Sequence, residues 1–252
     1  MKDNNKFRSI ALIPARMGSE RIKDKNVHIL DGHPLLAYTI RSAIDSNIFD
    51  RVICATDCER YAKIAKYYGA EIPFLRPSEN SGSNSADIEW VSFCLKKLRS
   101  NKKEYDIFSI LRPTSPFRGP ETIIRAFNEF LKNQNIDSLR GVEKCSQHPG
   151  KMWIKNDKFM TPLLPLKKDN IPWHSHQYAS LPEVYVQNAS IEIAWTKTVF
   201  SLHSISGEIV APFLTNNHEG FDINLPEDLD LAKILINKDK SILPKIKIPA
   251  YE

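Results

Sequence analysis

The first residues that suggest chemistry form a polar segment directly after a short apolar run. Residues 13–26 read Ile-Pro-Ala-Arg-Met-Gly-Ser-Glu-Arg-Ile-Lys-Asp-Lys-Asn. Small residues let backbone N–H groups approach an anion and cations neutralise it; here they are Ala15, Gly18 and Ser19, with Arg16, Arg21, Lys23 and Lys25. A triphosphate needs both, because negative charge must be stabilised as pyrophosphate leaves. We therefore expect a phosphate site; an exposed basic loop is the alternative.

This segment matches neither of two common phosphate-binding motifs, the G-x-x-x-x-G-K-S/T loop and the dinucleotide fingerprint. Its position still favours a binding site, because doubly wound α/β folds bind phosphates at the carboxyl end of the first strand. Loops held by a rigid scaffold are also where binding residues concentrate. The scaffold must therefore place a strand before residue 14 and a helix after the loop.

Short apolar runs alternate with amphipathic segments through the first half of the chain. We expect strands at 9–13, 51–55, 72–75 and 105–111, and helices at 34–44, 59–68, 86–99 and 121–132. Strands separated by helices of this length indicate βαβ units, and therefore a mainly parallel sheet covered on both faces. A strand at 189–195 and a helix at 226–236 complete the predicted α/β fold.

The alternation stops between residues 146 and 186. This stretch contains two tryptophans, few helical patterns and five prolines, namely Pro149, Pro162, Pro165, Pro172 and Pro182. It is long for a loop, which indicates a role of its own, such as dimer contacts or a cover over the site. We therefore expect a catalytic domain made of 1–145 and 187–252, with 146–186 as an inserted arm.

The composition is that of an ordinary globular protein: of 252 residues, 42% are hydrophobic and 26% are charged. The net charge of +5 suits a polyanionic small molecule, and without basic runs it does not indicate nucleic acid. The four scattered cysteines form no C-x-x-C pair, which favours free thiols in a reducing cytoplasm over a zinc site or disulfides. We expect no secretory signal and no membrane span, because no apolar run approaches ~18 residues.

Several segments, in chain order, resemble motifs of the acylneuraminate cytidylyltransferases, which include the CMP-sialic acid synthetases and their bacterial relatives. These segments are 13–26, with its I-P-A-R-x-G-S…K-N pattern, 52–57, 75–79, 111–118, 186–189 and 221–229. The resemblance implies a three-layer, Rossmann-like nucleotidyltransferase fold with an inserted dimerisation subdomain. It also implies transfer of CMP from CTP to the anomeric hydroxyl of a sialic-acid-like (nonulosonic) sugar, with release of pyrophosphate.

The nucleotide-binding residues that the resemblance implies are Ala15, Arg16, Gly18, Ser19, Lys25, Asn26, Arg76, Ser85, Ala86 and Asp87. Arg16 and Lys25 would hold the CTP phosphates as catalytic groups, and Asn26 would contact the nucleoside. Arg76 would lie beside the cytosine, whose O2 and N4 groups suit an arginine donor and a carboxylate or backbone acceptor. A surface ion pair is the alternative for Arg76.

The implied acceptor-binding residues are Arg112, Thr114, Ser115, Lys151, Gln177, Tyr178 and Asn188. Arg112 stands where many relatives carry glutamine, and its charge suits a sugar carboxylate. Relatives also carry an arginine shortly before a Leu-Pro pair. This chain has the Leu-Pro pair but not the arginine, so Lys151 would supply charge instead. The acceptor is therefore expected to be an unusual acidic sugar, and an eight-carbon (Kdo-like) keto-acid sugar is an alternative.

The family's two metal-binding aspartates correspond here to Asp222 and Asn224, which share one side of an extended segment. Mg²⁺ (or Mn²⁺) prefers hard oxygen ligands, and an amide adds no charge, so we expect Asp222 to be the main ligand and a catalytic residue. A turn or helix-entry role is the alternative for Asp222. His174 and His176 form an H-x-H pair, which we interpret as hydrogen-bonding histidines because no third metal ligand has a clear spacing.

The family forms homodimers through its inserted region, so the resemblance implies a homodimer through residues 146–186. It implies no nucleic-acid or membrane partner. Asn224 and the missing arginine leave a second hypothesis, a catalytically lapsed homologue that senses CTP or a CMP-sugar. The intact polar loop in residues 13–26, which we call the first loop, argues against that hypothesis.

Overall fold

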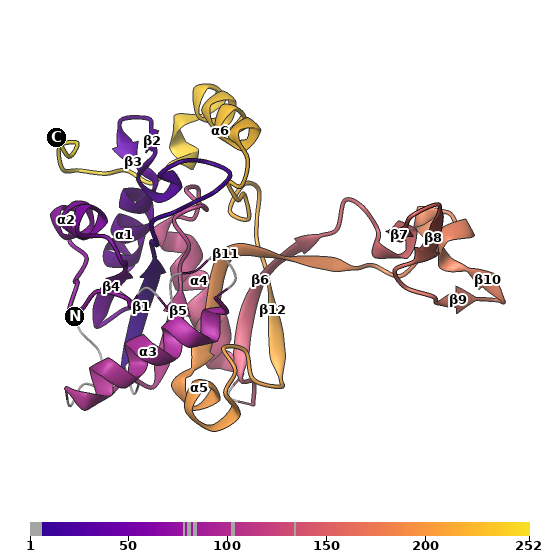
Figure 1. Ribbon diagram of the computed structural model, residues 1–252, viewed down its shortest axis with the longest axis horizontal. Helices are drawn as coiled ribbons and strands as arrows, with labels where there is room; N and C mark the ends of the chain where they lie inside the picture. Colours follow the sequence, from indigo (N-terminus) through magenta and orange to yellow (C-terminus); the bar gives the residue numbers. More distant parts are fainter. Residues whose placement is uncertain (1–6, 78, 80–81, 83–84, 102–103, 134) are drawn as a thin grey trace. The chain divides into compact units, whose positions relative to one another are not determined.

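The computed structural model describes residues 7–77, 79, 82, 85–101, 104–133 and 135–252, which form two compact units (Figure 1). The larger unit is Met1–Gly141 with Asn188–Glu252, and the smaller unit is Val142–Gln187. Helices of the larger unit are α1 (Leu35–Asp45), α2 (Glu59–Tyr67), α3 (Asp87–Ser100), α4 (Pro120–Lys132), α5 (Thr196–Leu202) and α6 (Pro226–Lys238), with 3₁₀ turns η1 (Lys25–Val27) and η6 (Lys240–Ile242).

A six-stranded sheet forms the centre of the larger unit, in the order β12-β6-β11-β5-β1-β4. Its strands are β12 (Val210–Leu214), β6 (Ser138–Lys144), β11 (Tyr185–Trp195), β5 (Ile107–Ile110), β1 (Ser9–Pro14) and β4 (Arg51–Ala55). β1 pairs in parallel with β4 and β5, whereas β11 is antiparallel to β5. A short hairpin of β2 (Ile29–Leu30) and β3 (His33–Pro34) lies before α1. The predicted α/β fold with a mainly parallel sheet is confirmed.

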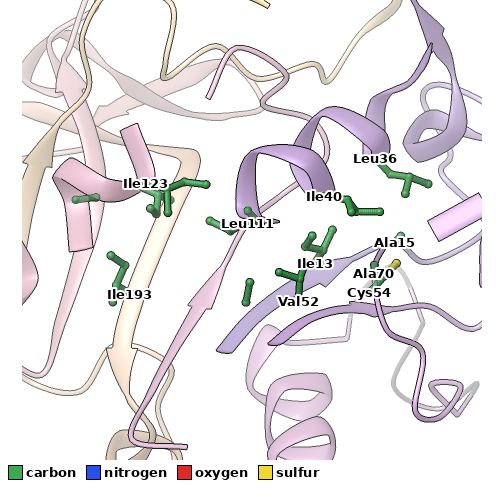
Figure 2. Close-up of a cluster of buried hydrophobic side chains, with 14 of the residues drawn as sticks. Ile13, Ala15, Leu36, Ile40, Val52, Cys54, Ala70, Leu111, Ile123 and Ile193 are labelled. Atoms are coloured by element: carbon green, nitrogen blue, oxygen red, sulfur yellow. The ribbon is translucent and has the colours of Figure 1, made fainter. Parts of the chain in front are cut away.

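Both faces of the sheet are buried, which explains why its central strands are continuous apolar runs. Successive residues of a strand point to opposite faces. Ile13 therefore packs with Leu36 and other side chains of α1, α2 and α4, as Figure 2 shows in part. Leu12 packs on the opposite face with Trp90 of α3 and Val199 of α5. The result is a helix–sheet–helix sandwich with the first loop at one end of β1.

A separate apolar cluster holds the last helix against the first. Leu229 and Ile236 of α6 pack with Tyr38 of α1 and with Phe117, and Ile223 is fully buried among them. Ile223 lies between the two predicted metal ligands, so this cluster fixes the backbone that carries both of them. The core of the larger unit thus reaches directly under the candidate site.

The smaller unit has little interior. It contains the hairpin of β7 (Trp153–Asn156) and β8 (Phe159–Pro162), the two-residue pair β9 (Lys167–Lys168) and β10 (Ile171–Pro172), and 3₁₀ turns η3 (Pro149–Lys151), η4 (Trp173–Ser175) and η5 (Tyr178–Ser180). Only His148, Gly150 and Leu181 are buried within Val142–Gln187. Its dimerisation and acceptor-covering roles stay predictions.

The strand predicted at 72–75 is wrong. Only Glu71 forms a bridge to β4, where its N–H donates to Val52 O and its carbonyl accepts from Cys54 N. Pro73 has no N–H to continue such a ladder, so the chain leaves the sheet edge there. The chain returns to the sheet at Arg76, whose N–H donates to Thr56 O. β6, β12 and α5 were not predicted.

Two further observations concern the described part of the chain. None of its helices is long and apolar enough to cross a bilayer. Cys54, Cys58, Cys94 and Cys145 are free thiols, and burial raises the pKa of Cys54 and Cys94 to about 12.

Candidate active site

A cleft of about 370 Å³ opens at the carboxyl ends of β1 and β5, next to Pro14 and Pro113. This size is within the range of small-ligand sites. Most of the residues predicted to bind nucleotide, acceptor or metal line it: Arg16, Ser19, Lys25, Asn26, Arg76, Ser85, Asp87, Arg112, Thr114, Asp222 and Asn224. Segments far apart in sequence therefore meet in one polar cavity, although their individual roles stay predictions.

The first loop is held by backbone contacts to the end of β4. The Ala15 N–H donates to Ala55 O (3.0 Å), and the Met17 N–H donates to the carboxylate of Asp57 (2.8 Å). Gly18 has φ +82°, a left-handed conformation that glycine adopts without a Cβ penalty. The loop thus leaves β1 at a fixed angle, with Arg16 half-buried and facing the cleft.

Asn26 closes the other end of the loop. Its Nδ2 donates to Arg16 O (3.1 Å), so the buried Asn26 side chain ties the loop's two ends together. Asp24 anchors the intervening turn on α2, where it accepts from Tyr61 Oη (2.8 Å) and pairs with Arg60 (2.7 Å). Arg16 and Lys25 are therefore presented by a braced loop rather than by a free basic segment.

Lys25 reaches the segment that carries the predicted metal ligands. Its Nζ donates to Ile223 O (2.9 Å) and to Asn224 Oδ1 (3.4 Å). Burial lowers the pKa of Lys25, and the neighbouring Asp222 carboxylate opposes that shift. The Ile223 N–H donates to Thr114 O (2.8 Å), so this segment is bonded to the loop after β5 as well. One lysine and one backbone segment thus join three walls of the cleft.

Asp222 and Asn224 both line the cleft, as the two-residue spacing predicts. Asn224 Nδ2 donates to Asp222 Oδ2 (2.5 Å), whereas the buried Asp222 Oδ1 has no hydrogen-bond partner among the described residues. A buried carboxylate oxygen without a donor suits a cation. The described residues contain no group of three or more His, Cys, Asp or Glu that could hold a metal. The donor set therefore fits Mg²⁺ only if substrate phosphates complete the coordination, which is how Mg²⁺ is commonly bound.

The start of α3 forms another wall, with Asp87 and Trp90. Asp87 accepts from Trp90 Nε1 at Oδ1 (2.7 Å) and from Arg112 Nη2 at Oδ2 (2.6 Å), so protein donors engage both oxygens. The Arg76 guanidinium lies over the Trp90 ring (5.2 Å to the centroid), and burial lowers the pKa of Arg76. Arg76 is 5% exposed, which argues against the surface ion pair as its role.

The loop after β5 is fixed from below by Arg118. This guanidinium is fully buried, and its Nη atoms donate to Thr39 Oγ1 (2.7 Å), to Arg112 O and to Ser190 O. The bonds join the loop to α1 and β11. Burial lowers the pKa of Arg118 to about 9. The sequence motif at 111–118 thus includes a residue whose contacts are internal rather than with the cleft.

Some predicted residues do not line the cleft. Ala15, Gly18 and Ala86 belong to the loop and the helix start but are not part of its wall, and Ser115 is 1% exposed. The Asn188 amide bonds to Ser190 N (3.2 Å) and Thr215 Oγ1 (2.9 Å), while its neighbour Ala189 lines the cleft.

Three of the predicted acceptor residues, Lys151, Gln177 and Tyr178, belong to the smaller unit. Lys151 Nζ donates to the carbonyls of His174 and His176 and lies 5.7 Å from the centre of the Tyr178 ring. His176 Nε2 lies 3.1 Å from Lys168 O, and the His174 ring lies 4.6 Å from that of Trp153, which agrees with hydrogen-bonding and packing roles for the H-x-H pair.

The cleft also has lining residues that the sequence did not reveal, among them Trp90 and Ala189. Glu192 and Arg140 form a buried ion pair behind the cleft and were missed as well. The available signal was a charged residue inside an apolar strand, as in Ile191-Glu192-Ile193. Such a charge requires a partner.

Comparison with known proteins identifies the family of the chain. Residues 10–158 match a family model described as cytidylyltransferase. The chain is 32% identical to a CMP-N,N'-diacetyllegionaminic acid synthase of Legionella pneumophila, over 94% of the chain and 100% of that relative. It is 31% identical to an N-acylneuraminate cytidylyltransferase of Escherichia coli, over 96% of the chain but 54% of that relative.

The fold has counterparts among solved structures. A CMP:2-keto-3-deoxy-manno-octonic acid synthetase complexed with CTP superposes with a TM-score of 0.67 at 14% identity, covering 92% of this chain and 99% of that one. A 4-diphosphocytidyl-2C-methyl-D-erythritol synthase of Anaerococcus prevotii has a TM-score of 0.64. These two likenesses concern the fold alone, and the assignment rests on the family match and the sequence relatives. The chain belongs to the cytidylyltransferase family.

Proposed function

We propose that the protein transfers CMP from CTP to the anomeric hydroxyl of a nonulosonic acid and releases pyrophosphate. The observation that carries this proposal is the contact of Lys25 with Ile223 O and Asn224 Oδ1, which brings the cationic first loop to the Asp222 carboxylate. Cations and a metal-ligating carboxylate on one cavity wall suit a leaving pyrophosphate. Relatives named for diacetyllegionaminic acid and N-acylneuraminate support the acceptor class.

The cleft divides into a phosphate end and a base end in this proposal. Arg16, Ser19 and Lys25 receive the triphosphate, on a loop whose backbone Ala15 and Gly18 shape. Asn26 contacts the nucleoside. Arg76 donates to the cytosine beside Trp90, with Ser85 and the backbone at Ala86 nearby. The carboxylate of Asp87 already accepts two protein hydrogen bonds, so a backbone carbonyl is the better acceptor for the cytosine N4 group.

The acceptor end comprises Thr114, with Arg112 in the wall between base and acceptor; the buried Ser115 and the internally bonded Asn188 would support this end from behind rather than contact the sugar. Lys151, Gln177 and Tyr178 contribute from the smaller unit, which we propose as the inserted arm (146–186) that also forms a homodimer contact. Its exposed apolar side chains support that role; they include Trp153, Ile154, Phe159 and Met160.

The reaction needs no covalent enzyme intermediate. The sugar hydroxyl attacks the α-phosphorus in line with the leaving pyrophosphate, and the chain supplies positioning and charge. Arg16 and Lys25 stabilise negative charge on the departing group. Asp222, with Asn224 beside it, would hold Mg²⁺ or Mn²⁺, which when bound adds positive charge at the phosphates. Ile223 fixes this carboxylate through its buried side chain and its bond to Thr114 O.

The test is pyrophosphate release with Mg²⁺, each of CTP, UTP, ATP and GTP, and a panel of nonulosonic and octulosonic acids. We expect release with CTP and a nonulosonic acid. Lys25→Ala should abolish it, whereas Lys233→Ala should not, because Lys233 is an exposed residue of α6 paired only with Asp230 (3.1 Å) among the described residues. Release with an octulosonic acid alone would reassign the acceptor. CTP binding without release for any acceptor would favour the lapsed, CTP-sensing homologue.

A further inference from the structure

Four charged side chains of alternating sign form a chain that runs from the sheet to the wall of the cleft. Arg140 of β6 pairs with Glu192 of β11. A single nitrogen of Arg112, Nη2, then donates to Glu192 Oε1 (2.8 Å) and to Asp87 Oδ2 (2.6 Å). Among the described residues, Arg112 makes both of its side-chain hydrogen bonds to carboxylates. The resulting order is Arg140, Glu192, Arg112, Asp87, with no net charge.

The two carboxylates differ in how they are compensated. Glu192, with 4% of its side chain exposed, has two cationic partners, Arg140 and Arg112. Asp87, 33% exposed, has only Arg112 as an ion-pair partner among the described residues. Burial would raise the pKa of Asp87, but the hydrogen bond and charge of Arg112 lower it overall. Arg112 therefore contributes most to lowering the pKa of Asp87, which stands at a wall that faces the proposed anionic ligand.

The chain of contacts continues beyond Asp87. Asp87 Oδ1 fixes the Trp90 indole by accepting from its Nε1, and the Trp90 ring carries the Arg76 guanidinium. A residue that fixes Asp87 thus also fixes the orientation of Trp90 and, through it, Arg76. Removal of Arg112 would release this arrangement and leave one uncompensated carboxylate in the cleft.

We infer that Arg112 is a positioning residue: it neutralises Asp87 and fixes its carboxylate at the start of α3, so that an anionic nucleotide can enter. It acts on the ligand through Asp87 rather than as the direct receptor of the acceptor carboxylate. The inference depends on the proposed function in one respect only, namely that the nucleotide bound in the cleft is CTP. When Arg112 is removed, Glu192 still has Arg140 as an ion-pair partner. Asp87 is therefore the carboxylate whose negative charge is expected to weaken CTP binding.

The experiment is a double-substitution cycle read by CTP binding. Calorimetry with Mg²⁺ compares the wild type, Arg112→Gln, Asp87→Asn and the double variant at low and high ionic strength. We expect Arg112→Gln to weaken CTP binding about ten-fold at low salt and less at high salt, since screening reduces repulsion by the unpaired Asp87. The double variant should bind within about three-fold of the wild type, because coupled residues are not additive.

Arg41→Gln is the matched control, because Arg41 is likewise an arginine paired with a carboxylate (Asp45, 2.6 Å) but lies on α1 away from the cleft. It should leave CTP binding unchanged. If Arg112→Gln does not fold, Arg112→Lys with and without Asp87→Asn gives the same comparison. A double variant that binds as weakly as Arg112→Gln, or more weakly, would overturn the inference. A wild type that binds CTP but transfers nothing would overturn the proposed reaction and leave this inference standing, since only binding is read.

Discussion

The two units of the chain are stabilised in different ways. The larger unit has three buried apolar clusters, including both faces of the sheet. The smaller unit buries only three of its described residues and exposes large apolar side chains, with Phe159 78% exposed and Met160 59% exposed. Burial of apolar side chains therefore accounts for the stability of the larger unit but not for that of the smaller one.

Local polar contacts account for the order within the smaller unit. Asp157, Asp169 and Asn170 have positive φ at the hairpin turns, a conformation that Asp and Asn tolerate well. Lys151 Nζ caps the carbonyls of His174 and His176. The comparison teaches that the segment is specified by turns and hydrogen bonds, and that its apolar surface is available for a contact.

The largest expected effect is on the free energy of unfolding, where a Phe→Ala substitution should act very differently in the two units. Phe130→Ala removes a fully buried ring of α4 and should lower the free energy of unfolding by about 3–5 kcal/mol. Phe159→Ala in the smaller unit should change it by less than about 0.5 kcal/mol in the monomer. Urea unfolding at low protein concentration measures both. A large loss for Phe159→Ala that grows with protein concentration would show that this surface is covered by a second molecule.

The next effect concerns the chemistry that we assign to each unit. Asp222→Asn should lower kcat about 100-fold or more, because charge stabilisation at the phosphates is lost. Lys151→Ala should instead raise KM for the acceptor about ten-fold with kcat little changed, as loss of uniform binding does. Steady-state kinetics with each substrate varied gives the split. A fall in kcat alone for Lys151→Ala would contradict an acceptor-binding role for the smaller unit.

Asn224→Asp, in contrast to Asp222→Asn, is expected to strengthen metal binding in the larger unit. A second carboxylate beside Asp222 adds negative charge, which divalent cations favour, so affinity for Mn²⁺ in the presence of CTP should rise several-fold. Electron paramagnetic resonance of free Mn²⁺ measures this without reference to turnover. Weaker Mn²⁺ binding would indicate that the Lys25 contact to Asn224, rather than ligand charge, sets the affinity.

The smallest expected effect is a pH dependence that also distinguishes the units. Because the pKa of Asp87 is lowered in the folded protein, its ion pair stabilises the fold above the unfolded pKa of about 4 and is lost as pH falls through the folded value. The stability difference between the wild type and Asp87→Asn should therefore shrink in acid. Glu183 also has a lowered pKa, beside Lys144, but this pair is exposed, so Glu183→Gln should change stability little at any pH. Urea unfolding across acid pH measures both, and a constant Asp87 difference would contradict the linkage.

The amino-acid sequence was sufficient to predict most of the larger unit. Continuous apolar runs identified β1 and β4, and the two-residue period of an extended chain predicted that Asp222 and Asn224 share one side. β6 and β12 were missed because their sequences, Ser-Leu-Arg-Gly-Val-Glu-Lys and Val-Ala-Pro-Phe-Leu, contain charges or a proline that are untypical of strands. Their strand conformation depends on their neighbours in the sheet.

The candidate site was predictable where its residues are close in sequence and much less so where they pair across the fold. Arg16 and Lys25 follow one strand, so position alone indicated them. The ion pairs of Arg112 depend on the register that sets Glu192 opposite Ile110, and a single sequence does not contain that register. The charge of Arg112 alone suggests a residue for the sugar carboxylate, whereas the structure places two carboxylates of the protein, Asp87 and Glu192, beside it.

The smaller unit leaves and rejoins the sheet at nearly the same point. A Cβ at Gly141 would lie 2.7 Å from Asn188 Oδ1, so the two ends of the inserted segment adjoin on neighbouring strands. The entropic cost of closing a loop rises only slowly with loop length. The segment can therefore lengthen, shorten or be exchanged while the distance between its two ends on the sheet stays the same. In evolutionary terms this is a graft point: a lineage can vary the inserted segment while the sheet and its first loop are inherited unchanged.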